Sequence, residues 1–212
     1  MKRVESARLT RRRILASARE LLATDGYADM TIASLARHAK VSPQTVYNSI
    51  GGKAEVVKAM WDVSIAGDDE PVPMSERPEF LALRAATDLE TWAVAYANWS
   101  AHLGSRVAHL VDALQSHGPA GDPVLENLFA TTDKERRIGN TASLNGLIKA
   151  GALPESALPR AVDGVWVLSS PTMYVLMVVR NGWTHEDFAA WLAVQLQSAV
   201  QFAIERTHAS QG

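Results

Sequence analysis

The chain has 212 residues, of which 47% are apolar and only 9 are proline, so it can bury a core in one or two domains. It contains no cysteine, which excludes disulfides, thiolate metal sites and cysteine nucleophiles. The net charge is only −2, but residues 1–53 hold 10 Lys and Arg against 4 Asp and Glu, a net of +6, and the remainder has a net of −8. A basic module joined to an acidic one is typical of a nucleic-acid reader with a second function, although a basic tail alone would give the same asymmetry.

The first thirteen residues lack the apolar run of a signal peptide. The most lipid-like stretch, residues 161–179, contains Asp163, Gly164 and Pro171, which a membrane-spanning helix tolerates poorly. We therefore expect buried helices there, no membrane association and a cytoplasmic location.

The first helix is predicted from about Ser6 to Thr24, and Gly26 suits the left-handed position that ends it. Its apolar residues lie on one face: Ile14, Leu15, Ala18, Leu21 and Leu22. Four arginines near its start form either a solvated face or contacts to a phosphate backbone: Arg8, Arg11, Arg12 and Arg13.

The stretch 31–53 predicts two short helices joined by a tight turn. Thr31 is a good N-cap for the first, and Ser42 caps the second with Pro43 at its first position. Only Lys40 and Val41 separate the end of the first apolar pattern from the Ser42 cap, so the helices must cross steeply, as in a helix-turn-helix. The second helix would turn Val46 and Ile50 inward and would present polar groups that suit base edges and phosphates: Gln44, Thr45, Tyr47 and Asn48.

Gly51 and Gly52 then allow a sharp turn into a helix predicted over Lys53 to Ile65, with Val56, Val57, Met60 and Trp61 apolar. Lys53 would lie at its N-terminus, an unfavourable place for a cation unless an anion such as a DNA phosphate shares it. The acidic, proline-rich residues 67–78 are predicted to be a linker.

Beyond this linker we predict only helices, so the fold class is all-α. One long helix is capped by Asp88 and reaches His117, with a possible kink at Gly104. Asp122 and Pro123 begin another that ends at Gly151, Pro159 begins a third, and Pro171 restarts it. Residues 173–179 are apolar all round and are predicted to be buried on every side. Thr184 and Asp187 resemble a capping box for a last helix that reaches Arg206.

These residues resemble the TetR family of bacterial transcription regulators. The similarity rests on residues of the helix-turn-helix stretch and on the turn before it: Gly26, Tyr27, Thr31, Ile32, Leu35, Ala36, Ala39, Val41, Ser42, Thr45, Val46, Tyr47 and Lys53. The segment 145–154 and the turn 181–184 also resemble one branch of the family, in which the last two helices form the dimer interface.

The resemblance implies a homodimeric repressor that binds a near-palindromic DNA operator and is released by a small-molecule effector. Residues 1–53 would form the DNA-binding domain, continued by a connecting helix to about residue 66, and residues 67–212 the effector-binding and dimerisation domain. By position, Gln44, Thr45 and Asn48 would contact bases, and Thr31, Tyr47 and Lys53 would contact phosphates. Ser42 and Pro43, at the start of the reading helix, complete the predicted DNA-binding site.

The chain departs from the family pattern at one edge of this site. The family usually has an aromatic residue where this chain has Ile50, and often a His or Tyr where it has Ser49. The turn that follows, Gly51 and Gly52, is looser than most. These changes bear on the geometry and the phosphate contacts of the turn.

An aromatic face on the long helix is the candidate effector site. Trp92, Tyr96 and Trp99 recur at helical spacing with His102 beside them, and they form either a pocket wall for an apolar or aromatic effector or ordinary core. Trp166, Met173 and Met177 would supply the opposite wall. His102, His109 and Asp112 also lie near one face, but their spacing is poor for a metal, and we expect solvated or core histidines and no metal or cofactor.

The last helix has a second face of apolar and small residues besides the one that faces its own core. This pattern predicts either a helix-pair dimer interface or a deeper monomer core: Tyr174, Trp191, Val194 and Ser198 are the predicted contacts.

No catalytic motif is present, so we do not expect an enzyme. The sequence thus favours a ligand-responsive repressor. A helical dimer that binds a ligand or a protein and has lost operator recognition is the alternative, and a helical enzyme with the aromatic pocket as its active site is a third.

Overall fold

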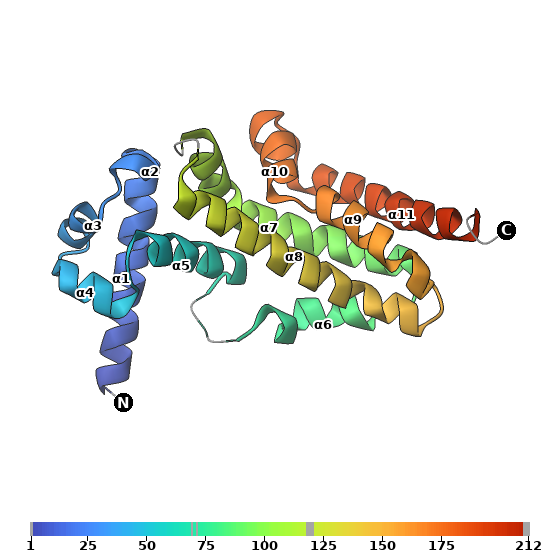
Figure 1. Cartoon of the computed structure of the whole chain (residues 1–212), viewed down its shortest axis with the longest axis horizontal. Coiled ribbons are helices and arrows are strands. Elements are labelled where there is room, and N and C mark those ends of the chain that lie inside the picture. Colours follow the sequence, from blue (N-terminus) through green and yellow to red (C-terminus); the bar gives the residue numbers. More distant parts are fainter. Residues whose placement is uncertain (1, 69, 71, 118–120, 210–212) are drawn as a thin grey trace. The chain divides into compact units, whose positions relative to one another are not determined.

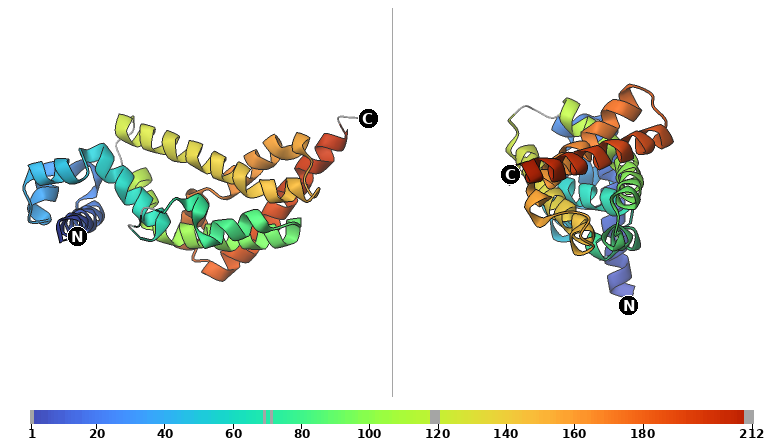
Figure 2. Two further views of the ribbon diagram at one scale, coloured as in Figure 1. Left: turned by 90° about the horizontal axis from the view of Figure 1, so that it is seen from below. Right: turned by 90° about the vertical axis from the view of Figure 1, so that its right-hand side faces the viewer.

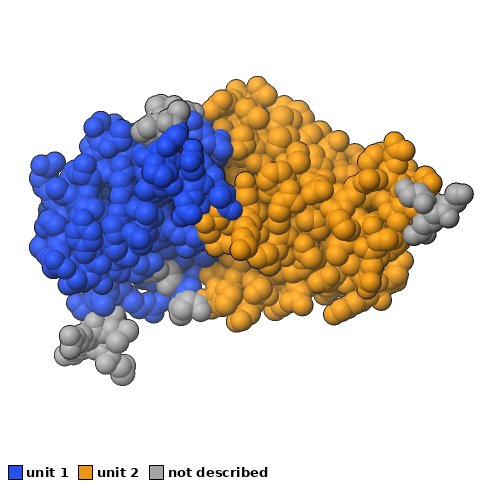
Figure 3. Space-filling model, in the orientation of Figure 1, with its two compact units in different colours: residues 1–70, 109–130 blue, residues 71–108, 131–212 orange. Residues whose placement is uncertain are grey.

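The computed structural model describes residues 2–68, 70, 72–117 and 121–209, and within these ranges it contains helices and no strands (Figure 1), which confirms the predicted all-α class. The chain divides into two compact units (Figure 3). Unit 1 comprises residues 1–70 and 109–130, and unit 2 comprises residues 71–108 and 131–212. Residues 109–130 therefore group with the N-terminal helices, and the functional boundary expected near residue 66 stays a prediction.

Unit 1 contains the helices predicted for the N-terminal third, at nearly the predicted bounds: α1 (Lys2–Thr24), α3 (Ile32–His38), α4 (Pro43–Ser49) and α5 (Lys53–Ala66). A further single turn, α2 (Gly26–Asp29), was not predicted. Gly26 does have the expected left-handed backbone, with a φ of +80°, but the chain there resumes a helical turn.

The predicted apolar faces of unit 1 are buried. Side chains on α1, α3 and α5 form its core: Ile14, Leu15, Ala18, Leu21, Leu22, Leu35, Ala36, Val56, Val57, Met60 and Trp61. Val46 is the fully buried residue of α4, whereas Ile50, which was expected to face inward as well, is half-buried. Burial of one side chain of α4 between its neighbours leaves the opposite face of that helix open.

Unit 2 contains or shares the remaining elements: η1 (Met74–Glu76), α6 (Pro78–Ala85), α7 (Leu89–His117), α8 (Pro123–Lys149), η2 (Glu155–Ala157), α9 (Leu158–Leu168), α10 (Pro171–Tyr174), the π-helix η3 (Val175–Arg180) and α11 (His185–Ala209). Because α7 and α8 extend past residues 108 and 130, they contribute to both units. The predicted linker, residues 67–78, contains the single turn η1 and ends where α6 begins. Two of its residues, Asp69 and Pro71, lie outside the described ranges.

The predicted helix starts of the C-terminal region are confirmed by their caps. Asp88 accepts a hydrogen bond from the backbone N–H of Thr91 (2.8 Å), and Thr184 accepts one from that of Asp187 (3.0 Å). Asp122 accepts from the N–H groups of Val124 and Leu125. Each side-chain oxygen satisfies a backbone donor that the first turn of a helix cannot pair internally.

Glycines on the long helices allow close packing. α7 runs through Gly104 as one helix, so this glycine does not end it; a Cβ atom there would lie 2.6 Å from Cγ of Tyr174. On α8, a Cβ at Gly146 would lie 2.5 Å from the carbonyl oxygen of Arg84. α9 and α11 lie side by side (Figures 1 and 2), with Gly164 against Ala199.

The apolar run 173–179 is not buried on every side, and this prediction is wrong for the single chain. Tyr174 and Val175 are buried, but Leu176 and Val179 expose 40% and 44% of their surface. The helical stretch Glu155–Arg180 is long and apolar enough to span a membrane by length and composition alone, with 22% of its most apolar window buried. Ser169, Ser170 and Pro171 interrupt it between α9 and α10. The half-exposed face of this stretch has no cover within the described part of the chain.

Candidate functional site

Helix α4 is short, capped and exposed on its polar face. Ser42 Oγ accepts a hydrogen bond from the backbone N–H of Thr45 (3.1 Å) and lies 2.8 Å from the Thr45 hydroxyl. Pro43 occupies the first position of the helix, where no N–H is needed. The cap and the proline together stabilise a seven-residue helix that would be marginal in isolation.

The exposed face of α4 carries the side chains predicted to read bases. Gln44 Nε2 donates a hydrogen bond to Oδ1 of Asn48 (2.9 Å), one helical turn away, so the two amides are aligned on one side. Tyr47 is 52% exposed, and Thr45 is half-buried at the cap. Amide groups that face solvent in this way can donate and accept in the pattern that base edges present in a major groove.

A tight turn joins α3 to α4. Ala39 ends α3, and the N–H of Val41 donates to the carbonyl of Ala36 (2.9 Å). Lys40 has a φ of +53°, the left-handed conformation that lets the chain reverse in so few residues. At the start of α3, Thr31 and Ser34 form a reciprocal capping box. The Thr31 side chain is exposed, and it accepts a hydrogen bond from the backbone N–H of Ser34.

The turn between α4 and α5 is ordered by a glutamate that the sequence analysis did not single out. Glu55 Oε2 accepts a hydrogen bond from the N–H of Gly52 (2.8 Å) and caps α5. Gly51 has a φ of +130°, and a Cβ atom there would lie 2.8 Å from Cβ of Glu55. Gly51 is therefore required by a capped turn of defined geometry.

Lys53, expected at a phosphate, has internal partners in the free protein. Its Nζ donates to the carbonyl of Tyr27 (2.6 Å) and lies 3.9 Å from the centre of the Tyr27 ring. Burial lowers the pKa of Lys53 from its usual value, an effect opposed by the nearby Asp122 and Asp29. A cation is unfavourable at a helix N-terminus, and the carbonyl oxygens and the ring face around Nζ stabilise the charge of Lys53 there.

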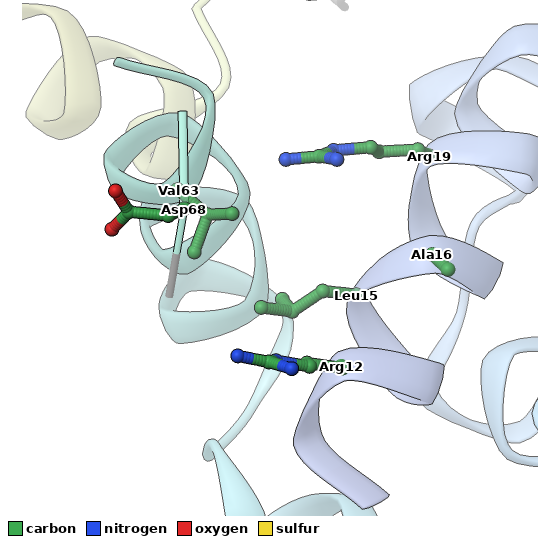
Figure 4. A pocket seen from close by; sticks show the side chains of 6 residues that line it. All are labelled: Arg12, Leu15, Ala16, Arg19, Val63 and Asp68. Carbon is green, nitrogen blue, oxygen red and sulfur yellow. The ribbon is translucent and has the colours of Figure 1, made fainter. Parts of the chain in front are cut away.

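Part of the basic charge on α1 is also paired within unit 1. Arg8 lies 2.8 Å and Arg12 3.8 Å from one carboxylate oxygen of Glu70. Arg12 and Arg19 extend from α1 toward α5 (Figure 4) and line an open pocket of about 350 Å³ with Leu15, Ala16, Val63 and Asp68. Arg19 donates to the hydroxyl of Ser64 (3.3 Å). Both interpretations of these arginines, solvated face and phosphate contact, stay open.

The aromatic face of α7 is packed on itself in unit 2. Trp92 and Tyr96 are fully buried, with ring centres 5.1 Å apart, and Trp99 touches both Tyr96 and Phe80. The fourth ring, Phe80, comes from α6, a helix that the sequence analysis did not predict. In this arrangement the rings contact one another as they would in a core.

A polar cluster is buried beside these rings. The Tyr96 hydroxyl pairs with the side chain of Asn140, and burial raises the pKa of Tyr96 to about 12. Arg136 donates to the carbonyl of Trp166 and to Asp133, while Arg137 lies 4.3 Å from the centre of the Trp166 ring. Trp166 is half-buried, as are Met173 and Met177. Neither Asn140 nor Arg136 was predicted, since their partners are distant in the sequence.

His102 lies outside the aromatic cluster, at a groove. Its Nδ1 is 3.1 Å from Nε2 of His185 on α11, and His185 contacts the Tyr174 hydroxyl in turn. The groove, with a volume of about 660 Å³, is lined by residues of α7 and α11, among them several alanines and the polar residues Glu90, Glu186 and Gln197. In the described ranges, no group of three or more His, Cys, Asp and Glu side chains could hold a metal ion, and His109 and Asp112 join no such group.

The predicted interface residues divide by exposure. Tyr174 is buried within its own chain, packed against α7 at Gly104. Trp191 is half-buried, Val194 is 59% exposed, and Ser198 is exposed. Other large apolar side chains of α9, η3, α11 and the turn before α11 are also exposed: Val167, Leu176, Val179, Trp183 and Phe202.

Comparison with known proteins places these features in a family. The capped α3–α4 pair with an exposed polar α4 is a helix-turn-helix. Residues 14–60 match the family model of bacterial regulatory proteins, tetR family, and this range covers the second half of α1, all of α2, α3 and α4, and the first part of α5. The match to the TetR family, which the sequence resemblance predicted, covers these N-terminal residues. No curated protein matches it.

Solved structures with a similar fold extend the likeness to most of the chain. A candidate fatty acid metabolism regulator from Clostridium perfringens has a TM-score of 0.63 at 12% identity, covering 89% of this chain and 98% of that one. A transcriptional regulator from Rhodococcus sp. Rha1 has a TM-score of 0.58 at 17% identity, with 90% and 96% covered. MexZ, a repressor from Pseudomonas aeruginosa, has a TM-score of 0.57 at 20% identity, with 90% and 94% covered. At these identities the likeness concerns the fold.

Proposed function

We propose that this regulator is a cytoplasmic repressor that binds a palindromic DNA operator as a homodimer and releases it when a small molecule binds unit 2. The observation that carries the proposal is α4, a capped helix whose amide and phenol groups face solvent inside a TetR-type helix-turn-helix. In the proposed complex Gln44, Thr45 and Asn48 contact bases, and Thr31 and Tyr47 contact phosphates.

Lys53 can act in one of two ways in that complex. It can keep its bond to the Tyr27 carbonyl, or it can leave this bond for a phosphate. In the free protein, its Nζ is held by the short bond to the Tyr27 carbonyl and by the contact with the Tyr27 ring.

The test is selection of duplexes from a random pool by the wild-type protein, followed by affinity measurements with two variants. Tyr47→Ala is expected to weaken binding to all sequences and to reduce the dependence of affinity on salt by about one phosphate contact. Gln44→Ala is expected to change the preference at one base position by about 1–3 kcal/mol.

Two outcomes would contradict this assignment. Variants that bind every duplex as the wild type does would show that α4 does not read DNA. A wild-type protein without affinity for any duplex at low salt would favour the alternative function, a helical dimer that has lost operator recognition.

The exposed apolar surface of α9, η3 and α11 supports the dimer. Val194 and Phe202 expose more than half of their surface on α11, and Leu176 is exposed on η3. A face of this kind is stabilised when a second copy covers it. Val194→Asp is expected to convert dimers to monomers in analytical ultracentrifugation, whereas a wild-type protein that sediments as a monomer would contradict the interface.

The effector is proposed to be apolar or aromatic. The groove beside His102 offers it volume, and entry at the Trp92, Tyr96 and Trp99 face would require these packed rings to separate. Release of DNA requires that the effector bind the form with low operator affinity more tightly. Equal effector affinity of the free and operator-bound dimer would rule out this mechanism.

A further inference from the structure

Tyr27 is held by a residue that follows it by 95 positions. Its side chain, in the single turn α2, is only 1% exposed. The Tyr27 hydroxyl donates a hydrogen bond to Oδ1 of Asp122 (3.2 Å), and both residues belong to unit 1. The bond therefore joins the N-terminal helices to the segment 109–130 within that unit.

Lys53 holds the same tyrosine from its other side. The lysine is the first residue of α5, and its Nζ contacts both the carbonyl (2.6 Å) and the ring face (3.9 Å) of Tyr27. The carbonyl of Ala28 lies 3.4 Å from the same Nζ. Carbonyl, ring and hydroxyl are thus all engaged, so Tyr27 cannot move without disturbing α5 or Asp122.

Asp122 is also the cap of α8. The oxygen that accepts from Tyr27 accepts from the N–H of Val124 (2.8 Å) and of Leu125 (3.1 Å) as well. α8 is one helix, with residues 123–130 in unit 1 and the remainder in unit 2. A continuous helix transmits displacement along its length, so a movement of α8 moves the carboxylate that holds Tyr27.

We propose that the Tyr27–Asp122 hydrogen bond couples α8 to the helix-turn-helix, and that Asp122 is a positioning residue that sets operator affinity. The inference rests on the proposed DNA-binding function. α2 leads through the buried Met30 to the Thr31 cap of α3, so a shift of Tyr27 is passed to the helix that supports α4. When α8 shifts, the chain either carries α2 with it or loses the bond.

A contact that only stabilises unit 1 would have a different signature. Its loss would lower the midpoint of thermal unfolding but would leave DNA affinity unchanged wherever the protein is folded. A coupling contact changes DNA affinity in the folded protein, and two substitutions at its two ends do not add.

The experiment uses the full chain and a duplex that the wild type selects from a random pool. Tyr27→Phe removes only the hydroxyl. Asp122→Ser keeps a good cap for α8 but shortens the side chain away from Tyr27. Asp122→Asn retains a side-chain oxygen for both tasks and serves as the conservative variant. Asp163→Asn removes an exposed carboxylate paired with Arg137 in unit 2 and is the control.

Fluorescence anisotropy at one salt concentration is expected to show about tenfold weaker binding for Tyr27→Phe and for Asp122→Ser. The double variant should be no weaker than either single variant. Asp122→Asn should lie close to the wild type, and Asp163→Asn should equal it. Circular dichroism at the assay temperature verifies that each variant is folded, and the two single variants give independent routes to the result.

Three outcomes would overturn the coupling. Tyr27→Phe that binds as the wild type does, with only a lower unfolding midpoint, would make the contact merely structural. A double variant about a hundredfold weaker than the wild type would make the two ends independent. A wild-type protein that selects no duplex would remove the DNA-binding proposal itself and the coupling with it, a result distinct from the other two.

Discussion

Helices α4 and α7 carry the two sets of polar and aromatic side chains that the sequence singles out, and they use them in opposite ways. On α4, Gln44, Tyr47 and Asn48 face solvent, and Val46 is the residue buried beneath them. On α7, Trp92 and Tyr96 are fully buried, and the polar handle of Tyr96 is satisfied inside. An exposed polar face that does not pack in the core can evolve to bind a partner. Rings that pack on one another contribute to the stability of the fold.

The largest expected effect comes from removing a ring of α7. Trp92→Ala should lower the free energy of unfolding by about 3–5 kcal/mol, because it leaves a large cavity in a packed cluster. Urea unfolding followed by circular dichroism measures this loss. A change below about 1 kcal/mol would show that the Trp92 ring lines a space that is already open. The rings of α7 would then not be packed as a core, and the contrast with the exposed face of α4 would fail.

The second effect is an alkaline loss of stability. Tyr96 has a pKa of about 12 in the folded chain against 10.0 as a free side chain, so between pH 10 and pH 12 the unfolded chain releases a proton that the folded chain retains. The free energy of unfolding should fall by about 2–3 kcal/mol across this window, whereas below pH 10 the residue contributes no pH dependence. Tyr96→Phe should make this part of the profile less steep and leave the contribution of Tyr27, whose pKa burial and Asp122 also raise to about 12. An unchanged slope would contradict the burial of the Tyr96 phenol.

A third effect tests how closely α7 is covered. Gly104→Ala should cost about 1–3 kcal/mol, because the new methyl group would overlap the ring of Tyr174. On α8, a methyl group added at Gly139 would meet no side chain and no other element within 4 Å, so Gly139→Ala should stabilise by up to about 1 kcal/mol through helix propensity. Thermal unfolding of both variants measures the two changes in stability. Changes of the same sign would contradict the expected contrast.

The smallest effect compares two caps of the same kind. Ser42→Ala and Thr184→Ala should each cost about 1 kcal/mol, because each leaves a first-turn N–H unpaired. Only Ser42→Ala should also weaken DNA binding, since it frays α4, and gel-shift titration separates the two. Equal losses of DNA affinity in the two variants would show that α4 is not the helix that contacts DNA.

Helix starts and core faces were predictable from the sequence because they depend on residues close together in the chain. Ser42, Asp88 and Thr184 all cap the helices they were expected to cap, and the α1 stripe is buried. The single turn α2 and the short α6 were missed, since neither is long enough to show helical periodicity.

Features that depend on distant residues were beyond the sequence. His102 and His185 are 83 positions apart, and nothing local in either segment indicates that they meet. Lys53 was placed at a phosphate by its family position, but its bond to the Tyr27 carbonyl depends on how α2 folds against α5. The apolar run 173–179 indicated burial on every side, but the packing of a single chain leaves Leu176 and Val179 partly exposed.

One oxygen atom, Oδ1 of Asp122, accepts from three donors, the two first amides it caps on α8 and the Tyr27 hydroxyl. Local opening of α2 therefore frees this oxygen for its remaining donors, and fraying of α8 frees it for the tyrosine. The amide protons of Val124 and Leu125 should consequently exchange with solvent deuterium more slowly when α2 opens, because they then share this oxygen with no third donor. Two peptide groups at the start of α8 would thus report on the order of the helix-turn-helix.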